Sequence, residues 1–502
     1  MSTTTQGTGQ VRTYRRNTWQ EAIAEYLPEN RRSPRAFVWI DRLPLIGIIL
    51  TMCVLSLRLR NSAMIDEALY INLGNQYLHG PLPTANDTDY ISGAPGLYPV
   101  IAGALDTVAG LWLVRLFSLA CMVVAVISVD RAVGALYGSR RAGIFAALAF
   151  ALTAPVVFIG MFATFDALVV MLLAVALALT TSRTSIASGA GVGVLLAVAS
   201  LTKYAGAPLA LAVLAIMVVT TRGSPRRPLV ATLAFATTLA VAWDRWSETL
   251  GPGISFTTSA RVAMGPTPRI ILVGTLLVTL GLLLVLALSG AFRPGPPHAG
   301  AWRAMALNVV LLGAGLALPL AQIRLGEGVS FGKHMAYSAL FLAPLVGREL
   351  AAMSRGMLRL LPVGVVTAIA LLVGWSGSAA LYAQWVDVSP VVDVIETDPQ
   401  GGTYLSSSAD VLDYYTKDHP QITWDTTFAL YSGGEGAIRS AVSGGDFQTV
   451  VLRTASTGNP AQDRGQAVLL EELEAGSTYE LAVEPFPVHR WSDDRWLVYT
   501  KK

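Results

Sequence analysis

The feature that most constrains this chain of 502 residues is a series of long apolar runs between residues 38 and 383. About 20 consecutive apolar residues cross the hydrocarbon core of a bilayer, so each run is a candidate membrane-spanning helix. Eleven runs fit this description: 38–57, 111–133, 142–160, 163–180, 187–202, 205–220, 228–243, 270–290, 303–321, 336–351 and 360–383. These are too many for the interior of one soluble domain, so we predict an all-α polytopic membrane protein over residues 38–385.

Arginine residues between the predicted spans indicate how the chain is oriented. A polar arm of residues 1–37 with several Arg precedes the first span, and five later connections contain Arg but no Lys: 137–141, 181–185, 220–227, 292–303 and 348–359. Cytoplasmic loops are enriched in Arg and Lys, so we place the arm and these connections in the cytoplasm. The long loops then lie outside: 58–110, 244–269 and 322–335.

The apolar stretch 96–110 needs a separate interpretation, because a full span there would invert every later loop and place the Arg clusters outside. We therefore expect a helix that lies at the outer surface of the membrane.

Residues 386–502 differ from the rest of the chain in charge. They hold 18 of its 33 acidic residues but only 8 of its 36 basic residues. Short β-type runs alternate here with polar helical stretches, the runs being 403–406, 449–453, 479–483 and 496–500. This pattern predicts a small soluble α/β domain, and the orientation places it on the extracytoplasmic side.

Three carboxylates stand at the predicted outer boundary of the membrane. Asp66 and Glu67 follow the first span, and Asp166 begins an otherwise apolar span. Such acids can simply favour the positive end of a helix dipole. However, an ionisable group at membrane depth usually faces a cavity or a charged partner. Because the predicted orientation brings all three to one side, we predict that they line one cavity and carry the chemistry.

Basic residues are predicted on the same side. They are Lys203, Arg261, Arg324, Lys333 and His334. Boundary Lys and Arg often extend toward lipid headgroups instead. Lys203 has apolar spans on both sides, so we expect it to face an anion such as a lipid phosphate. A carboxylate base beside cations suits transfer of a group carried on a lipid phosphate, whereas P-loop, Gly-x-Ser-x-Gly and His-Glu-x-x-His motifs are absent from the sequence.

These features resemble the GT-C glycosyltransferases, in particular the branch that contains protein O-mannosyltransferases and the lipid A aminoarabinose transferase. The resemblance covers residues 38–350 and rests on the Asp66-Glu67 pair, the segment 94–99, Arg115, the turn 137–141 and Asp166. It implies a membrane enzyme that transfers a sugar from a polyprenyl-phosphate donor to an extracytoplasmic glycan, protein or lipid, with inversion at the anomeric carbon.

The resemblance also implies roles for single residues. Asp66 takes the position of the general base, Glu67 supports it, and Asp166 lines the same cavity. The basic residues named above would bind the donor phosphate. Three tyrosines of the matching segments would line the cavity: Tyr70, Tyr98 and Tyr337.

Two positions depart from the family pattern, because Ala336 and Ala94 stand where relatives have Arg and Lys. Both departures remove a cation near the donor phosphate. No cofactor is certain from the sequence. Some relatives bind a divalent cation, for which Glu67 or His334 would be possible ligands, although one His without spacing partners is weak evidence.

A lipid-linked sugar flippase or transporter is the alternative interpretation. It predicts internal inverted repeats and broken helices near the midplane, and the sequence shows no such repeat. We therefore expect an enzyme with its active site outside. Low Lys with high Ala, Gly, Val and Arg content suggests a bacterial plasma membrane.

Overall fold

The computed structural model describes residues 42–80, 82–83, 88, 91–221, 223–260, 267–293, 300–354, 360–383, 385–457, 459–489 and 493–502. The chain divides into residues 1–46, of which only residues 42–46 are described, and a compact unit of residues 47–502. The contacts below lie within the second unit.

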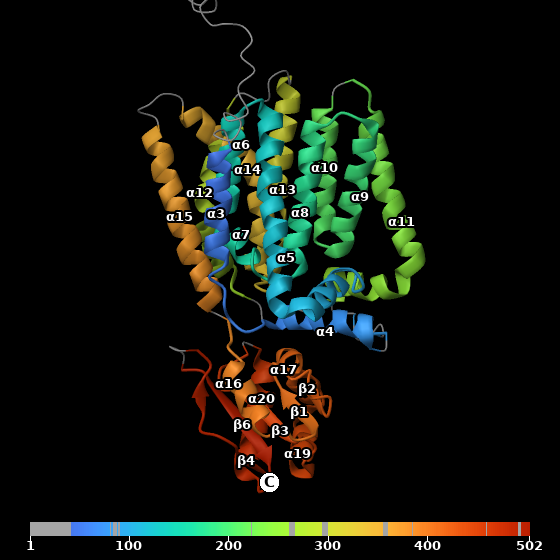
Figure 1. Ribbon diagram of the computed structural model, residues 1–502, viewed down its shortest axis with the longest axis vertical. Helices are drawn as coiled ribbons and strands as arrows, with labels where there is room; N and C mark the ends of the chain where they lie inside the picture. Colours follow the sequence, from blue (N-terminus) through green and yellow to red (C-terminus); the bar gives the residue numbers. More distant parts are fainter. Residues whose placement is uncertain are drawn as a thin grey trace, which may run out of the picture. The chain divides into compact units, whose positions relative to one another are not determined.

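Helices, most of them apolar, dominate residues 43–383 (Figure 1). Their bounds are α3 Leu43–Ser56, α4 Ile65–His79, α5 Tyr98–Tyr137, α6 Arg140–Ala151, α7 Ala154–Ile159, α8 Phe165–Ser182, α9 Ile186–Thr202, α10 Gly206–Thr220, α11 Arg226–Ser255, α12 Arg269–Ala291, α13 Ala301–Leu325, α14 Phe331–Met353 and α15 Leu360–Ala383. A short π-helix, Phe256–Ala260, follows α11. Each of the eleven predicted spans overlaps a helix.

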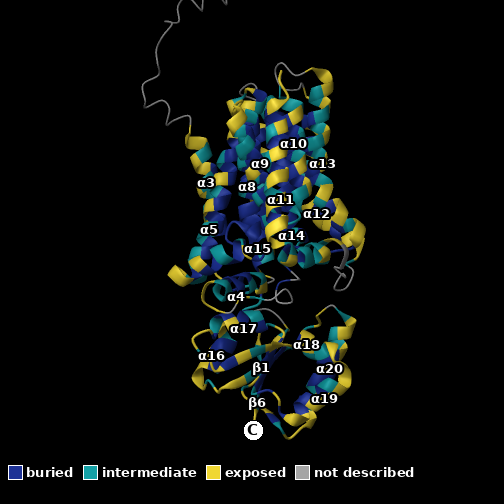
Figure 2. Ribbon diagram, turned by 90° about the vertical axis from the view of Figure 1, so that its right-hand side faces the viewer, coloured by how far each residue is buried: buried dark blue, intermediate teal, exposed yellow. Residues whose placement is uncertain are grey.

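Length and composition identify the helices that can cross a membrane. Within the described residues, five helices are long and apolar enough, in α5, α8, α12, α13 and α15, and three shorter helices, α3, α9 and α10, are also apolar. Helix α8 is largely buried among its neighbours, whereas α12 exposes large apolar side chains such as Ile270 and Val278. Figure 2 shows buried residues in the interior of the helical part and exposed ones along its outer helices. An apolar outer surface of this extent suits lipid contact, and the chain is an integral membrane protein.

Two helix breaks have a clear sequence origin. The predicted span 142–160 is divided between α6 and α7 because Thr153 is extended (φ −73°, ψ 138°) and Pro155 follows in the first turn of α7. Proline is favoured there but cannot continue a preceding helix.

Inside α5, Gly110 has a positive φ of 65° and Ala109 is also non-helical. The stretch before this kink is therefore a separate helical segment from residues 111–137, and its location at the membrane surface stays a prediction.

Two glycines let this first segment of α5 cross α4 closely. A Cβ atom at Gly74 would lie 1.9 Å from the carbonyl oxygen of Pro99, and one at Gly103 would lie 2.5 Å from the backbone of Gly74. Any side chain at either position would separate the helices, so the glycines fix the position of α4.

The C-terminal residues form a sheet with helices around it. Its bounds are α16 Ser389–Thr397, β1 Gly402–Ser406, α17 Ala409–Tyr415, β2 Ile422–Thr426, α18 Thr427–Ser432, α19 Gly434–Gly444, β3 Thr449–Arg453, α20 Pro460–Ala475, β4 Tyr479–Leu481, β5 Phe486–Pro487 and β6 Arg495–Lys501. The strand order is β2-β1-β3-β6-β4, with β5 paired to β6. The pairs of β1 with β2 and β3 are parallel, and those of β6 are antiparallel. Strands lie at all four sequence-predicted ranges, and a core around Leu405, Val450 and Leu469 fills one side.

Candidate active site

The ends of four helices carry the charged residues singled out in the sequence. Asp66 and Glu67 lie in the first turn of α4, and Asp166 lies in the first turn of α8. Lys203 directly follows α9, and Lys333 and His334 belong to the first turn of α14. These helix ends meet, so residues that are up to 268 positions apart in the sequence form one cluster.

Asp166 is the centre of the buried part of this cluster. Its side chain is fully buried, and its Oδ1 lies 2.5 Å from Lys203 Nζ. The same oxygen accepts a hydrogen bond of 2.8 Å from Tyr337 OH, while Thr164 Oγ1 donates to Oδ2 over 3.1 Å. A buried charge is tolerated when it is paired and hydrogen-bonded. The two charges of Asp166 and Lys203 therefore satisfy each other.

The backbone before α5 holds Lys203 in place. Tyr204 N donates to Ser92 O over 2.9 Å, and Ala94 N donates to Leu201 O over 2.7 Å. A Cβ atom at Gly93 would lie 2.1 Å from Thr202 O. This segment of the first long loop consequently packs directly on the chain around Lys203, and only glycine fits at the contact.

Asp66 is the most accessible of the three carboxylates. It forms an ion pair with Lys333, and its side chain is 29% exposed while that of Lys333 is 10% exposed. The ammonium group of Lys333 also lies 5.2 Å from the ring centre of Phe162. Asp166 interacts electrostatically with Lys333 and His334 as well as Lys203, and Lys203 interacts with Asp66. Two ion pairs thus form a single charged cluster, which contains part of the set named from the sequence; that these residues line a cavity stays a prediction.

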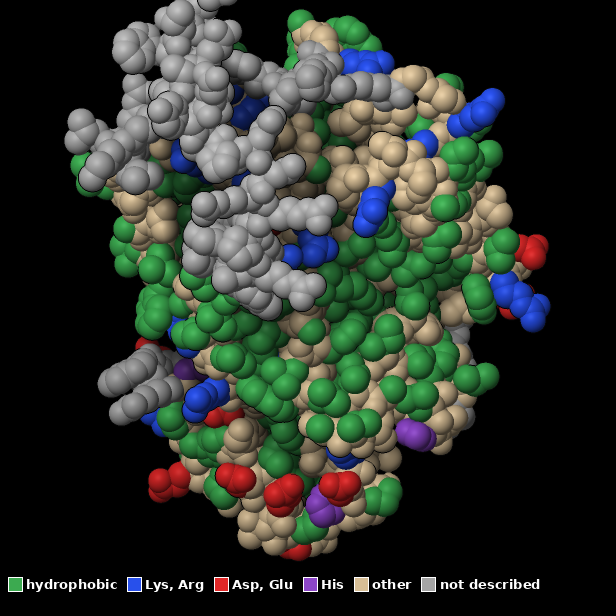
Figure 3. Space-filling model, turned by 45° about the horizontal axis from the view of Figure 1, so that its top comes forward, with side chains coloured by type: hydrophobic (Ala, Val, Ile, Leu, Met, Phe, Trp, Pro, Cys, Tyr) green, Lys and Arg blue, Asp and Glu red, His purple; other side chains and the backbone are tan. Residues whose placement is uncertain are grey.

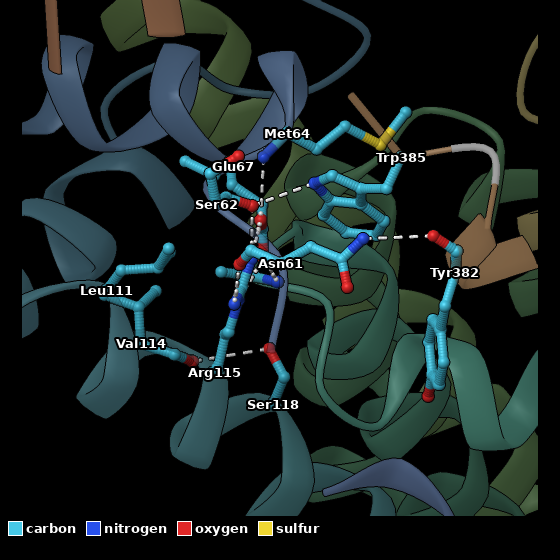
Figure 4. Close-up of polar contacts among 12 residues, drawn as sticks. Asn61, Ser62, Met64, Glu67, Leu111, Val114, Arg115, Ser118, Tyr382 and Trp385 are labelled. Carbon is cyan, nitrogen blue, oxygen red and sulfur yellow. Dashed lines mark hydrogen bonds and ion pairs between the residues drawn. The ribbon is translucent and has the colours of Figure 1, made fainter. Parts of the chain in front are cut away.

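Glu67, although adjacent to Asp66, is engaged in a different network (Figure 4). Its Oε1 accepts from Arg115 Nε over 2.9 Å and from Ala163 N over 2.8 Å. Its Oε2 accepts from Arg115 Nη2 over 2.6 Å and from Met64 N over 3.0 Å. Arg115 also donates to the carbonyl oxygens of Asn61 and Ser62. Both oxygens of this buried carboxylate are occupied, so Glu67 anchors the start of α4.

The contacts of Glu67 and His334 determine whether these residues could bind a divalent cation. The oxygens of Glu67 face four N–H donors, and a cation there would have to displace the guanidinium of Arg115. His334 Nδ1 lies 2.8 Å from Gln322 Oε1. Among the described residues, no group of three or more His, Cys, Asp or Glu side chains could hold a metal ion. Glu67 does not fit a metal ligand.

The three tyrosines predicted to line the cavity are buried around the cluster. The rings of Tyr70 and Phe165 are 4.8 Å apart between centroids, and Tyr98 contacts both rings edge-on at 5.8 and 6.2 Å. Tyr337 donates to Asp166, as described above. Tyr70 and Tyr98 therefore form one aromatic cluster with Phe165, the residue before Asp166.

Two predicted phosphate-binding residues are not part of the described cluster. Arg324 is an exposed residue in the last turn of α13, where its carbonyl oxygen accepts a hydrogen bond from Arg269. Arg261 lies outside the described residues.

Asp106 is a buried acid that the sequence interpretation missed. Its Oδ1 accepts from Tyr414 OH over 2.7 Å, and its Oδ2 lies 3.0 Å from Lys417 Nζ. Asp106 therefore joins the first segment of α5 to the C-terminal residues around α17. The signal was present, because an acid inside the apolar stretch 96–110 demands a partner.

Comparison with known proteins places this geometry in a wider context. Residues 101–246 match the family model described as dolichyl-phosphate-mannose-protein mannosyltransferase. Comparison with curated protein sequences gives no significant match.

Several solved structures have the same fold. ArnT from Cupriavidus metallidurans in the apo state superposes with a TM-score of 0.59 and 16% identity, over 93% of this chain and 98% of that chain. Arabinofuranosyltransferase AftD from Mycobacteria gives 0.54 and 16%, over 91% of this chain and 41% of that chain. The oligosaccharyltransferase AglB from Archaeoglobus fulgidus gives 0.52 and 10%, over 81% and 69%. This chain thus spans less than half of AftD but nearly all of ArnT.

The matched family model and these three structures represent glycosyltransferases of the GT-C type. The resemblance stated from the sequence is confirmed. The chain has the fold of the GT-C glycosyltransferases.

Proposed function

We propose that this chain transfers a sugar from a polyprenyl-phosphate donor to an acceptor on the extracytoplasmic side of a bacterial plasma membrane. The observation that carries the proposal is the ion-paired cluster of Asp66, Lys333, Asp166 and Lys203 at the meeting point of four helix ends. The fold supports it, since ArnT from Cupriavidus metallidurans has been solved bound to undecaprenyl phosphate and AglB in complex with a dolichol-phosphate.

Among the three acids, Asp66 is the one placed to act as general base. A base must reach the proton that it removes. Glu67 has both oxygens occupied by donors, and Asp166 is fully buried against Lys203 and Tyr337. The side chain of Asp66 is partly exposed, and Lys333 is its ion-pair partner among the residues that the structure describes. We assign Glu67 and Asp166 to positioning the base and the cations.

The proposed reaction is one displacement. An acceptor hydroxyl gives its proton to Asp66, its oxygen forms a bond to the anomeric carbon, and the bond from that carbon to the phosphate oxygen breaks. The departing polyprenyl phosphate keeps the electron pair, and Lys333 and His334 are the basic groups near it. A single displacement inverts the anomeric carbon.

The membrane topology is part of the same proposal. Eleven spans place the arm 1–37 in the cytoplasm, the catalytic domain 38–385 in the membrane and residues 386–502 outside as a separate domain. Protease added to intact spheroplasts should then release a fragment of the size of residues 386–502. Complete protection of these residues would contradict the orientation.

The activity is tested by transfer from a radiolabelled polyprenyl-phosphate sugar pool in membranes. Asp66→Asn keeps the shape of the side chain but cannot accept a proton, so transfer should fall by about 10²- to 10⁴-fold. Donor retention, measured separately, should persist. Asp393→Asn, at an exposed acid of α16, is the matched control and should leave transfer unchanged. Wild-type turnover by Asp66→Asn would refute the assignment of the base.

A further inference from the structure

A second polar site lies at the opposite end of the helices from the charged cluster. Asp166 occupies the first turn of α8, whereas this site begins at Thr180 and Thr181 near the end of that helix. An α-helix rises about 1.5 Å per residue, so the two sites are roughly 20 Å apart along α8. The pocket has a volume of about 540 Å³ and lies between the ends of α5, α8 and α10 and the starts of α9, α11 and α13.

The charge of this pocket is uniformly positive over the residues that the structure describes. Four arginines line it, Arg183, Arg226, Arg227 and Arg303, and its described lining contains neither Asp nor Glu. Hydroxyl groups complete the polar wall, from Thr181, Thr184 and Ser224 among others. Figure 3, which brings this end of the molecule forward, shows Lys and Arg side chains here and acidic side chains toward the other end.

Three buried polar atoms of the lining lack a hydrogen-bond partner among the described residues. They are Thr180 Oγ1, Thr221 Oγ1 and Arg227 Nε. Arg227 is 7% exposed and uses its other nitrogens to bond the carbonyl oxygens of Thr180 and Leu179, over 3.1 and 2.8 Å. Buried polar groups are almost always satisfied, so three unsatisfied atoms just behind the wall of one pocket favour a polar ligand toward which the wall adjusts.

We propose that this pocket binds a phosphate group. Guanidinium groups and hydroxyls are the donors that recognise phosphate, and four arginines without a carboxylate leave their charge for an anion. The wall continues into apolar side chains, namely Leu136, Ile186, Val219 and Leu307, at the boundary of the membrane-spanning helices. This combination suits the headgroup and first methylenes of an anionic phospholipid, although a soluble phosphate shares the same headgroup chemistry.

Ligand-induced stabilisation of the full-length protein in neutral detergent tests the site. A ligand that binds only the folded state stabilises it by RT ln(1 + [L]/Kd), so Tm rises with ligand concentration and with affinity. The two probes are dioctanoyl phosphatidylglycerol, with dioctanoyl phosphatidylcholine as the neutral comparison, and inorganic phosphate. We expect a rise in Tm that grows with the concentration of phosphatidylglycerol and little change with phosphatidylcholine. A rise with inorganic phosphate alone would assign the site to a soluble ligand and support the same chemistry.

Variants locate the binding. Arg183→Gln combined with Arg226→Gln changes two exposed arginines of the lining. This variant should need about tenfold or more phosphatidylglycerol for the same rise in Tm. Arg141→Gln, at an exposed arginine outside the lining, is the matched control and should respond as wild type. Equal responses in all three proteins, or no response in wild type, would overturn the proposal.

A variant at an unsatisfied hydroxyl gives an independent answer that does not depend on the arginines. Thr180→Val removes a buried hydroxyl of similar size, so Tm without ligand should stay the same or rise. If the hydroxyl contacts the phosphate, the phosphatidylglycerol concentration that gives the same rise in Tm should increase severalfold. An unchanged response would remove Thr180 from the site and contradict the argument from unsatisfied atoms. The readout is binding, so it is independent of whether Asp66 is the base for sugar transfer.

Discussion

Neutralising Asp66 and neutralising Glu67 should have different consequences, although the two substitutions change charge and size alike. Glu67→Gln should destabilise the fold, whereas Asp66→Asn should abolish transfer in a folded protein. The difference follows from exposure, because the side chain of Glu67 is fully buried against Arg115 and that of Asp66 is 29% exposed.

The magnitude for Glu67→Gln comes from its four contacts. Each carboxylate oxygen accepts from one Arg115 nitrogen and one backbone N–H, of Ala163 or Met64. Whichever oxygen becomes an amide NH₂, that group faces two donors, and Arg115 loses its counter-charge. Breaking a buried pair in this way costs about 3–5 kcal/mol. The partly exposed ion pair of Asp66 contributes only about 1 kcal/mol or less.

The assay is equilibrium unfolding of the purified protein in mixed detergent micelles, followed by tryptophan fluorescence, with sugar transfer measured in parallel. Glu67→Gln together with Arg115→Met removes both charges and should recover part of the lost free energy of unfolding, which measures their coupling. A Glu67→Gln protein as stable as wild type would refute the structural role of Glu67.

Three further predictions concern other acids of the chain. Lys203→Met should lower the free energy of unfolding by about 3–5 kcal/mol because the buried Asp166 loses the cation in contact with it, and adding Asp166→Asn should restore most of it. Asp106→Ala should loosen the contact with Lys417, so limited proteolysis between α15 and α17 should become faster than in wild type. Burial and the nearby Asp413 raise the pKa of Asp410. The folded state then binds this proton more tightly than the unfolded state, and the stability contribution is lost as pH rises through the raised pKa. Asp410→Asn should therefore unfold at higher denaturant concentration than wild type at pH 7, with the gain shrinking toward pH 3.

The positions of the helices were predictable because bilayer thickness imposes a length on apolar runs. Each predicted span overlaps a helix, and α7 differs only because Pro155 starts a new helix inside one run. The charged cluster was also predictable, since helices that alternate in direction bring every second end to the same side of a membrane. Asp66 and Asp166 meet their lysines for this reason.

The partners of the acids outside the cluster were not predictable. Sequence spacing cannot show that Arg115 pairs with Glu67, which lies 48 positions earlier, or that Lys417 pairs with Asp106 across 311 positions. Such pairs depend on the packing of α4 against α5, which in turn needs the close approach at Gly74 and Gly103. The different roles of two adjacent acids therefore become visible only in three dimensions.

The adjacency of the two acids explains how the proposed base is oriented. Successive residues of an α-helix point about 100° apart, so fixing the direction of residue 67 also fixes that of residue 66. Glu67 is fixed by four hydrogen bonds at the start of α4, while Asn72, further along the same helix, donates to Asp410 O and Asp413 Oδ2 of α17. The helix is thus held at its start by α5 and along its length by the C-terminal residues. Because the rest of α4 holds the backbone of Asp66, the ion pair with Lys333 leaves its side chain the accessible surface that a base requires.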